Sequence, residues 1–440
     1  MPPPEVFPND IVSPFATLSM FRQTTLDNGL EIIAECNVNA YSLATGFFVK
    51  TGARDESDDV AGVSHFLEHA MFKGTPTRSA ADVNRELDEL GAYANAYTTE
   101  ETTCYYAVLL PELQDRAIDL LGDILRPSLR REDFETEKQV ILEEIKMYDD
   151  QPPFGADEKL RELFFGNHPL RRSVLGTCES IEQLTVEQMR EYFERQYRPN
   201  NMVLAAAGNV DFNALVQKAD EKCGHWQPHH VERIHRRPTA NSGFHLMHKD
   251  SATQQYVMRM FNGVSGDESN RERYAAFLLS HIIGDEVGSR MYWTLLDPGL
   301  ADSCSFSMVE YTDVGVYIAS LSCAPDMVGE NMQRIDAMIT DIQSHGVTEE
   351  ELARSRTKTL SRSVLANEIP GNRLFAFGNE WLQDRKYYTI HEELEFVRSV
   401  TLNDINEVLA KYPLKNPYTI SIGPLEHWPT VSSEMREISL

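Results

Sequence analysis

Two histidines and a glutamate lie close together in the chain and could hold a metal ion. His65 and His69 are four residues apart, so on a helix their side chains point to the same side. An imidazole nitrogen is a good zinc ligand. Glu68 directly precedes the second histidine, where its carboxylate could take a proton from a water that the metal polarises. The alternative is a helix with two hydrogen-bonded histidines and a solvent-exposed glutamate.

A helical projection places the three polar side chains on one face of the predicted helix. At about 100° per residue, His65, Glu68 and His69 occupy one sector roughly 100° wide. The opposite sector contains only apolar side chains, namely Val63, Phe66, Leu67 and Ala70. One side of the helix can therefore pack into a core while the other presents two nitrogens and a carboxylate.

A third metal ligand is expected elsewhere, because a catalytic zinc ion usually has three protein ligands. The glutamate-rich segment 131–149 is predicted to be a helix. On its projection Glu137 and Glu144 fall inside an apolar stripe and lie about 10 Å apart along the axis. The side chains expected to form this inward-facing stripe are Phe134, Val140, Ile141, Ile145 and Tyr148.

Two inward-facing carboxylates need a partner, because burying an unpaired charge is costly. We assign Glu144 as the third metal ligand and Glu137 as a residue behind the ligands that orients His69 or Glu68. The alternative is a pair of carboxylates bound to arginines between two helices. The two-histidine motif favours the metal site, because both features then share one partner.

The elements that must position these residues follow from local patterns. Segment 24–50 is predicted to form strands joined by a turn at Asn28-Gly29. Helices are expected at 79–90 and 111–125, on either side of an extended segment at 92–110. Further helices and a strand of the first half are expected at 156–165, 186–196 and 202–208.

The second half repeats this plan without the metal ligands. A glycine-containing polar loop precedes the helix in both halves. In that alignment His65, Glu68 and His69 correspond to Phe277, Ser280 and His281. Strands and helices of this half are expected at 245–261, 271–283, 303–322, 327–344, 348–367 and 418–423.

These patterns divide the chain into an arm at 1–24, a metal-binding domain at 25–224, a linker at 225–243 and a domain without a metal site at 244–440. The linker contains prolines and has little periodicity. Its four histidines lack a regular spacing and a carboxylate partner. A solvated linker is therefore favoured over a second metal site.

Composition restricts the possible partners and location. The chain has 440 residues and a formal net charge of -27, which argues against nonspecific binding to nucleic acid or an anionic membrane. The favoured interpretation of this charge is simple solubility, and binding of basic peptides is the alternative. The six cysteines are scattered and form no C-x-x-C pair, so reduced thiols are expected. No secretory signal and no long apolar run is seen, so we expect a cytoplasmic protein that does not span a membrane.

The motif and the later glutamate resemble one family. His65-Phe66-Leu67-Glu68-His69, with Glu144 further along, is similar to the inverzincin zinc peptidases, which include pitrilysin, insulysin and mitochondrial processing peptidase. Segments 91–98 and 137–147 resemble the family's strand beside the substrate and the helix with its third ligand. The resemblance covers most of the chain, whose length is that of the short, two-domain bacterial members.

The resemblance implies an α+β fold of two homologous domains, each a mostly antiparallel sheet with helices packed on one face. It implies a zinc-dependent metalloendopeptidase that cleaves unfolded peptides or oligopeptides inside a dimeric chamber, as a homodimer or as a heterodimer with a related subunit. Zn²⁺ would be held by His65, His69 and Glu144, with Glu68 as the catalytic base. A peptide would add as a strand at Asn95 and Ala96, which match the family's edge segment.

The sequence departs from the family at one place. Active members carry an Arg and a Tyr, seven residues apart in the second domain, that hold the substrate carbonyl or the oxyanion. The alignment puts Leu295 and Asp302 there, and neither can donate a hydrogen bond to an oxyanion at neutral pH. Arg290, Tyr292 and Tyr311 are candidates to replace them. The chain could thus need a second subunit for activity, or act as a non-catalytic scaffold or peptide-binding subunit.

Overall fold

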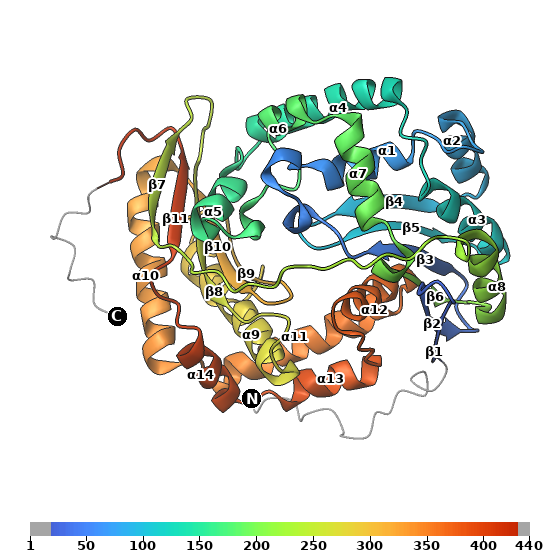
Figure 1. The fold of residues 1–440 in the computed structure, drawn as a ribbon. Coiled ribbons are helices and arrows are strands. Elements are labelled where there is room, and N and C mark those ends of the chain that lie inside the picture. Colours follow the sequence, from blue (N-terminus) through green and yellow to red (C-terminus); the bar gives the residue numbers. More distant parts are fainter. Residues whose placement is uncertain (1–18, 430–440) are drawn as a thin grey trace.

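A computed structural model describes residues 19–429, which form two sheets lying side by side with helices around them (Figure 1). The strands of the first sheet are β1 (Ser19–Thr25), β2 (Glu31–Asn37), β3 (Leu43–Val49), β4 (Tyr93–Thr98), β5 (Thr103–Leu109) and β6 (Met202–Gly208). Those of the second sheet are β7 (Gly243–His248), β8 (Gln255–Gly263), β9 (Ser303–Glu310), β10 (Gly315–Cys323) and β11 (Tyr418–Gly423).

Both sheets are mostly antiparallel and share one connectivity. The strand orders are β1-β2-β6-β3-β5-β4 and β7-β11-β8-β10-β9. Apart from β1, each strand of the first sheet has a counterpart in the second, in the same order along the chain and with the same neighbours. Only the β2–β6 and β7–β11 pairs are parallel. The expected α+β fold with two related domains is confirmed.

In each half the helices lie between the strands along the chain. Those of the first half are α1 (Val63–Met71), α2 (Ala80–Glu89), α3 (Gln114–Ile124), α4 (Arg131–Asp150), α5 (Ala156–Phe165), α6 (Cys178–Gln183), α7 (Val186–Gln196) and α8 (Phe212–Cys223). Those of the second half are α9 (Asn270–Gly284), α10 (Val328–His345), α11 (Glu349–Asn367), α12 (Pro370–Asp384), α13 (Ile390–Ser399) and α14 (Leu402–Lys411). The two-histidine motif is on α1, and α9 is the counterpart of this helix after β8.

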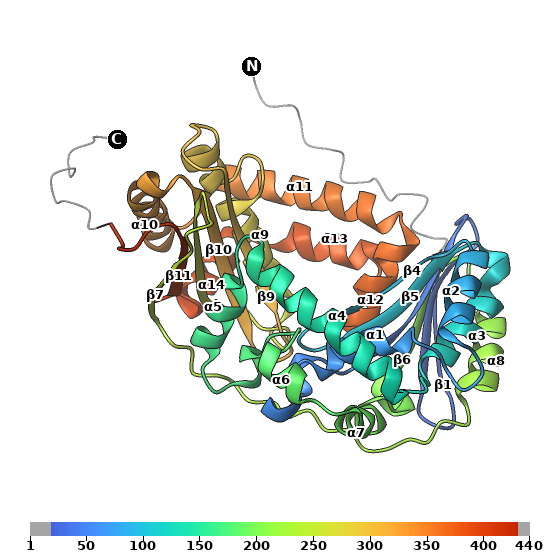
Figure 2. The same ribbon diagram turned by 90° about the horizontal axis from the view of Figure 1, so that it is seen from above.

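Each half also contributes a helix to the other, and this helix covers the sheet face that the helices of the sheet's own half leave open. Helix α12 packs against β3 and β6 of the first sheet (Figure 2). Its Gly378 is required there, because a Cβ atom would lie 2.6 Å from the ring of Phe48. Conversely, helix α5 of the first half packs against the second sheet, where its Leu160 and Phe164 share a hydrophobic core with Ile420. The two halves therefore bury apolar surface against each other.

The segment between α8 and β7 crosses from one half to the other without helix or strand (Figure 1). The expectation of a solvated linker is wrong at Arg233, whose side chain is buried. Its Nε and Nη2 atoms donate to the two carboxylate oxygens of Asp55 at 2.8 and 2.6 Å. A buried guanidinium requires such a partner, so this part of the linker is fixed to the first half.

A buried cluster of charges joins the halves beside this anchor. Glu101, in the turn after β4, accepts hydrogen bonds from Arg54 Nη1 at 2.5 Å and from the Thr312 backbone N–H at 3.0 Å. Arg54 also donates through Nη2 to Asp313, at 2.8 Å. Thr312 and Asp313 lie in the turn between β9 and β10. The turns that follow β4 and β9, which are counterparts, are thus connected by ion pairs.

Two boundaries differ from expectation. The first strand begins at Ser19, inside the segment expected to be an arm. Segment 245–261 is two strands, not one, because β7 is parallel to β11 whereas β8 is antiparallel to it, so the chain must turn between them. Residues 1–18 of the expected arm lie outside the described part. Within residues 19–429, no helix is long and apolar enough to cross a bilayer.

Candidate metal centre

Helix α1 has the apolar face that its sequence predicts. Val63, Phe66 and Leu67 are fully buried in the core of the first half, and Ala70 is almost so. The ring of Phe66 stacks on that of Phe134 in α4, with centroids 4.8 Å apart. This contact holds the motif helix against the helix that carries the two glutamates.

The structure brings His65, His69 and Glu144 together. Glu144 Oε2 lies 3.8 Å from His65 Nε2 and 3.7 Å from His69 Nε2. One ligand atom from each residue lies within 4.8 Å of the other two. Zinc bonds of roughly 2.0–2.2 Å in tetrahedral geometry separate ligand atoms by about 3.4 Å, so these residues fit a zinc ion with small adjustments.

The two histidines have different protonation tendencies. Burial, together with the nearby His69, lowers the pKa of His65 to about 3, so its imidazole is neutral and able to coordinate. Burial would also lower the pKa of His69, but a hydrogen bond to Glu137 and the charge of Glu144 outweigh it and raise that pKa. A metal ion that binds here would displace any proton from the His69 nitrogen facing Glu144.

Glu137 lies behind His69, on the side away from Glu144. Its Oε1 is 2.9 Å from His69 Nδ1, and its Oε2 is 2.7 Å from Lys73 Nζ. Burial alone would raise the pKa of Glu137, but His69 and Lys73 lower it, so the carboxylate stays ionised. A carboxylate bound to Nδ1 fixes the ring orientation and leaves Nε2 for a metal, as is usual for zinc-binding histidines.

Glu68 lies beside the edge of the first sheet. Its Oε2 accepts a hydrogen bond from Thr98 Oγ1 at 2.6 Å. Burial raises the pKa of Glu68, and the Thr98 hydrogen bond opposes that rise. The remaining oxygen is available for proton transfer, and a raised pKa suits a group that accepts a proton and later returns it.

The inward face of α4 differs from the expected stripe. Val140 and Tyr148 are 46% and 53% exposed, so their predicted burial is wrong. The buried face of α4 is instead rotated toward Lys138 and Leu142, whose side chains are buried. Glu137 and Glu144 therefore lie at the border of the apolar face and not in its middle. At that border Glu144 reaches both the histidines and solvent, which a water-using metal site requires.

A cleft of about 480 Å³ opens at these side chains. Its walls include His65, Glu68 and Glu144, together with Ala96 of β4. Ala96 thus reaches the cleft, whereas Asn95 is not among the residues that line it. Asn95 Oδ1 instead accepts a hydrogen bond from the Ala96 backbone N–H at 2.9 Å. Strand β4 ends the sheet and pairs, among the described strands, only with β5.

Sequence reasoning missed Thr98, Lys73 and the ion pair of Glu100 with Arg161 that lines the cleft. Thr98 is the last residue of a strand that was predicted. Thr98 is two residues after Ala96, and residues two apart on a strand point to the same face, so this spacing would have placed both side chains on one side. The sequence around Arg161 does not indicate its partner Glu100, because Glu100 lies far from it in the chain.

The positions that replace the family's Arg and Tyr do not reach the cleft. Leu295 is fully buried in the core of the second half, and Asp302 is exposed. Arg290 is held in ion pairs with Glu351 and Asp341 at 2.7 Å. Among residues 19–429, every residue that lines the cleft belongs to the first half.

Tyr311 is the one candidate replacement in contact with a residue of the cleft. Its hydroxyl accepts a hydrogen bond from Arg161 Nη1 at 2.6 Å. Tyr292 lies in the helical turn Tyr292–Leu296 and is not among the residues that line the cleft. Through Tyr311, the second half therefore contacts Arg161, one of the residues that line the cleft.

Comparisons with known proteins identify the family to which this two-domain fold belongs. The family model described as Insulinase (Peptidase family M16) matches residues 31–178, and the Peptidase M16 inactive domain model matches residues 183–359. A Mycobacterium tuberculosis protein named an uncharacterized zinc protease is 31% identical over 411 residues, 92% of this chain and 93% of that protein. Bacillus subtilis YmxG, also named an uncharacterized zinc protease, is 29% identical over 93% of this chain and 100% of its own.

Solved structures show the same arrangement. An M16-like peptidase from Alicyclobacillus acidocaldarius has a TM-score of 0.82 and 25% identity, covering 92% of this chain and 99% of that one. A protease from Helicobacter pylori has a TM-score of 0.86 at 18% identity, covering 92% and 100%, which shows the fold alone. The chain belongs to peptidase family M16, the insulinase family. The inactive-domain model covers α9, the counterpart of the motif helix α1.

Proposed function

We propose that the protein is a zinc-dependent endopeptidase that cleaves unfolded peptides or oligopeptides. The observation that carries this proposal is the convergence of His65, His69 and Glu144 at a cleft that also contains Glu68 and the free edge of β4. A structural zinc site normally has four protein ligands, often cysteines. Here three candidate ligands and a carboxylate that is not needed as a ligand meet at a cleft.

Each residue then has a defined task. His65, His69 and Glu144 would hold Zn²⁺, which when bound activates water and polarises a peptide carbonyl. Glu68 takes the proton of the attacking water and passes it to the leaving amine nitrogen. The hydroxyl of Thr98 keeps the carboxylate of Glu68 in place, and Glu137 orients His69.

The substrate proposed for this cleft is an extended peptide that pairs with β4. The Ala96 backbone N–H is bonded to the Asn95 side chain and not to β5, so it faces the free edge of the strand. A peptide carbonyl could replace that side chain as acceptor. Addition of a strand uses backbone hydrogen bonds and gives little sequence specificity, which suits unfolded peptides as substrates.

The test is to measure zinc content and cleavage of an unstructured peptide together. The wild type should bind about one zinc ion per chain and cleave the peptide. Glu68→Gln should keep the zinc and lose cleavage by about 10²–10⁴-fold, because it cannot accept a proton. Cleavage by the variant at the wild-type rate would contradict the role of Glu68.

A second candidate is a subunit whose activity depends on a partner, or which only binds peptides. It is favoured by the absence of any second-half residue among those lining the cleft, within residues 19–429, and by the burial of Leu295. Under this proposal a related chain supplies the oxyanion donors within a heterodimer. Full activity of a homodimer of this chain alone would exclude it. Zinc-loaded protein that binds but never cleaves peptides, with or without a partner, would indicate a scaffold.

The proposed location is the cytoplasm. All six cysteines lie in the described part of the chain and are free thiols, four of them buried. Reduced cysteines are the rule in that compartment.

A further inference from the structure

A carboxylate outside the ligand set holds the start of the metal-binding helix. Glu56 is buried and lies in the loop before α1. Its Oε2 accepts a hydrogen bond from the Gly62 backbone N–H, and its Oε1 accepts one from the Ser64 N–H, both at 2.7 Å. The first N–H groups of a helix have no acceptor within the helix. Gly62 has no side chain that could supply one, so Glu56 performs this task from six residues away.

Other contacts fix the same turn. Gly62 has a φ of 89° and lies against the backbone of another segment, where an added Cβ would be 2.5 Å from the carbonyl oxygen of Leu175. The hydroxyl of Ser64 is 2.9 Å from that of Tyr192, which is 2.8 Å from that of Thr51. The turn that precedes the first metal ligand is therefore held on several sides.

The two histidines depend on this turn to different degrees. His69 Nδ1 is bound to Glu137, which orients its ring independently of the helix start. His65 Nδ1 is buried and has no hydrogen-bond partner within the described residues. The position of the His65 ring therefore depends on packing and on the backbone of the first turn, which Glu56 holds.

We propose that Glu56 is a positioning residue of the metal centre, which sets the place of His65 by binding the Gly62 and Ser64 N–H groups. The inference rests on the proposed zinc site and adds a residue to its support. Glu56 is not one of the three candidate ligands and is not among the residues that line the cleft. Loss of this carboxylate should weaken metal binding and change the geometry of the site. These effects should be larger than the accompanying loss of fold stability can explain.

The experiment compares Glu56→Gln with Asp404→Asn as a matched control. Asp404 is also a buried carboxylate at a helix start, where it accepts a hydrogen bond from the Thr401 N–H at 2.7 Å, but it lies in the half without the metal site. Apoprotein of each variant is titrated with Co²⁺, and affinity, visible absorption and thermal unfolding are recorded. Measurements at pH 8 keep Glu56 ionised, because burial raises its pKa to about 7 against the effect of the Ser64 and Gly62 hydrogen bonds.

The expected result separates positioning from stability. Both variants should unfold at lower temperature. Only Glu56→Gln should weaken Co²⁺ binding, by about 10–100-fold as for other residues that orient ligands, and change the absorption bands of the bound ion. Wild-type affinity and an unchanged spectrum in this variant would overturn the inference. If it does not fold, Tyr192→Phe, which frees the Ser64 hydroxyl in the same turn, should show a smaller shift in the same direction, and no shift would equally overturn it.

Failure of the proposed function is visible separately. Glu68→Gln should bind Co²⁺ like the wild type while losing peptide cleavage. A wild type that binds Co²⁺ but cleaves no peptide would contradict the peptidase proposal and leave the role of Glu56 standing. A normal peptidase in which Glu56→Gln leaves Co²⁺ binding unchanged would contradict only the role of Glu56.

Discussion

At the scale of single residues, two neighbouring glutamates on α4 lie in different surroundings. Glu144 points to the two histidines, whereas the side chain of Glu143 is 74% exposed and pairs with Lys146. A rotation of about 100° along the helix separates them. Of the two carboxylates, the angular position on the helix decides which one reaches the histidines.

Substitution of each glutamate tests this distinction. Glu144→Gln should weaken zinc binding by more than about 100-fold, which exceeds the effect typical of residues that only orient ligands. Glu143→Gln should leave zinc affinity unchanged, because an exposed ion pair contributes little. Competition with a chromogenic chelator measures both. Equal affinities of the two variants would remove Glu144 from the ligand set.

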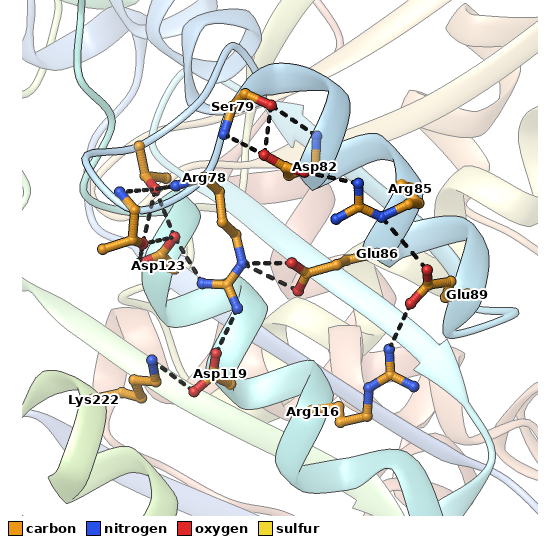
Figure 3. A network of polar contacts seen from close by, with 12 residues as sticks. Arg78, Ser79, Asp82, Arg85, Glu86, Glu89, Arg116, Asp119, Asp123 and Lys222 are labelled. Carbon is orange, nitrogen blue, oxygen red and sulfur yellow. Dashed lines mark hydrogen bonds and ion pairs between the residues drawn. The ribbon is translucent and has the colours of Figure 1, made fainter.

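At the scale of elements, α2 connects the motif helix to the edge strand. The chain runs from α1 through α2 to β4, so α2 must be fixed for the cleft to keep its shape. Arg78, just before α2, makes ion pairs with Glu86 at 3.1 Å and with Asp119 and Asp123 of α3 at 2.7 and 2.9 Å (Figure 3). Lys222 of α8 extends the network through Asp119, at 2.6 Å.

Removing Arg78 should destabilise this connection. Arg78→Met leaves three carboxylates close together without their shared cation, so the free energy of unfolding should fall by about 2–3 kcal/mol. Arg85→Met is the control, because its side chain is 58% exposed and its pairs with Asp82 and Glu89 should contribute less than about 1 kcal/mol. Urea unfolding measures both. A loss at Arg85 as large as that at Arg78 would argue against the network.

At the scale of the molecule, the halves are joined by exchanged helices and by a buried charge cluster. Arg54 and Arg233 face Glu101, Asp55 and Asp313, all nearly inaccessible to solvent. The cluster contains the turn after β4, so it lies close to the strand proposed to bind substrate. Domains that share so much buried surface should unfold together.

Glu101→Gln tests this connection between the halves. Loss of the charge facing two buried arginines should cost about 3–5 kcal/mol, because it leaves them without full compensation. Glu350→Gln, whose side chain is 80% exposed and pairs with Arg354, should change stability by less than about 1 kcal/mol. Calorimetry should show one transition for both variants, shifted down only in the first. Two transitions in the wild type would contradict the coupling of the halves.

Local periodicity was least informative where tertiary packing overrides it. Val140 and Tyr148 are apolar or aromatic at positions that would suit a buried stripe, yet both are exposed on α4. Helices α12 to α14 were not predicted, although α12 covers the first sheet. The helical spacing of its apolar residues can be read along the chain, but the sheet that they cover cannot, because that sheet belongs to the other half.

The sequence by itself determined the motif helix, its apolar face and the repeated plan of the two halves. These features depend on spacing within one element or on similarity between segments, both of which can be read along the chain. Only the tertiary structure decided that Thr98 holds Glu68 and that Glu56 holds the start of α1. It also decided that each half covers the other's sheet. Such contacts join segments that are apart in the chain, and which ones meet depends on how the whole core packs.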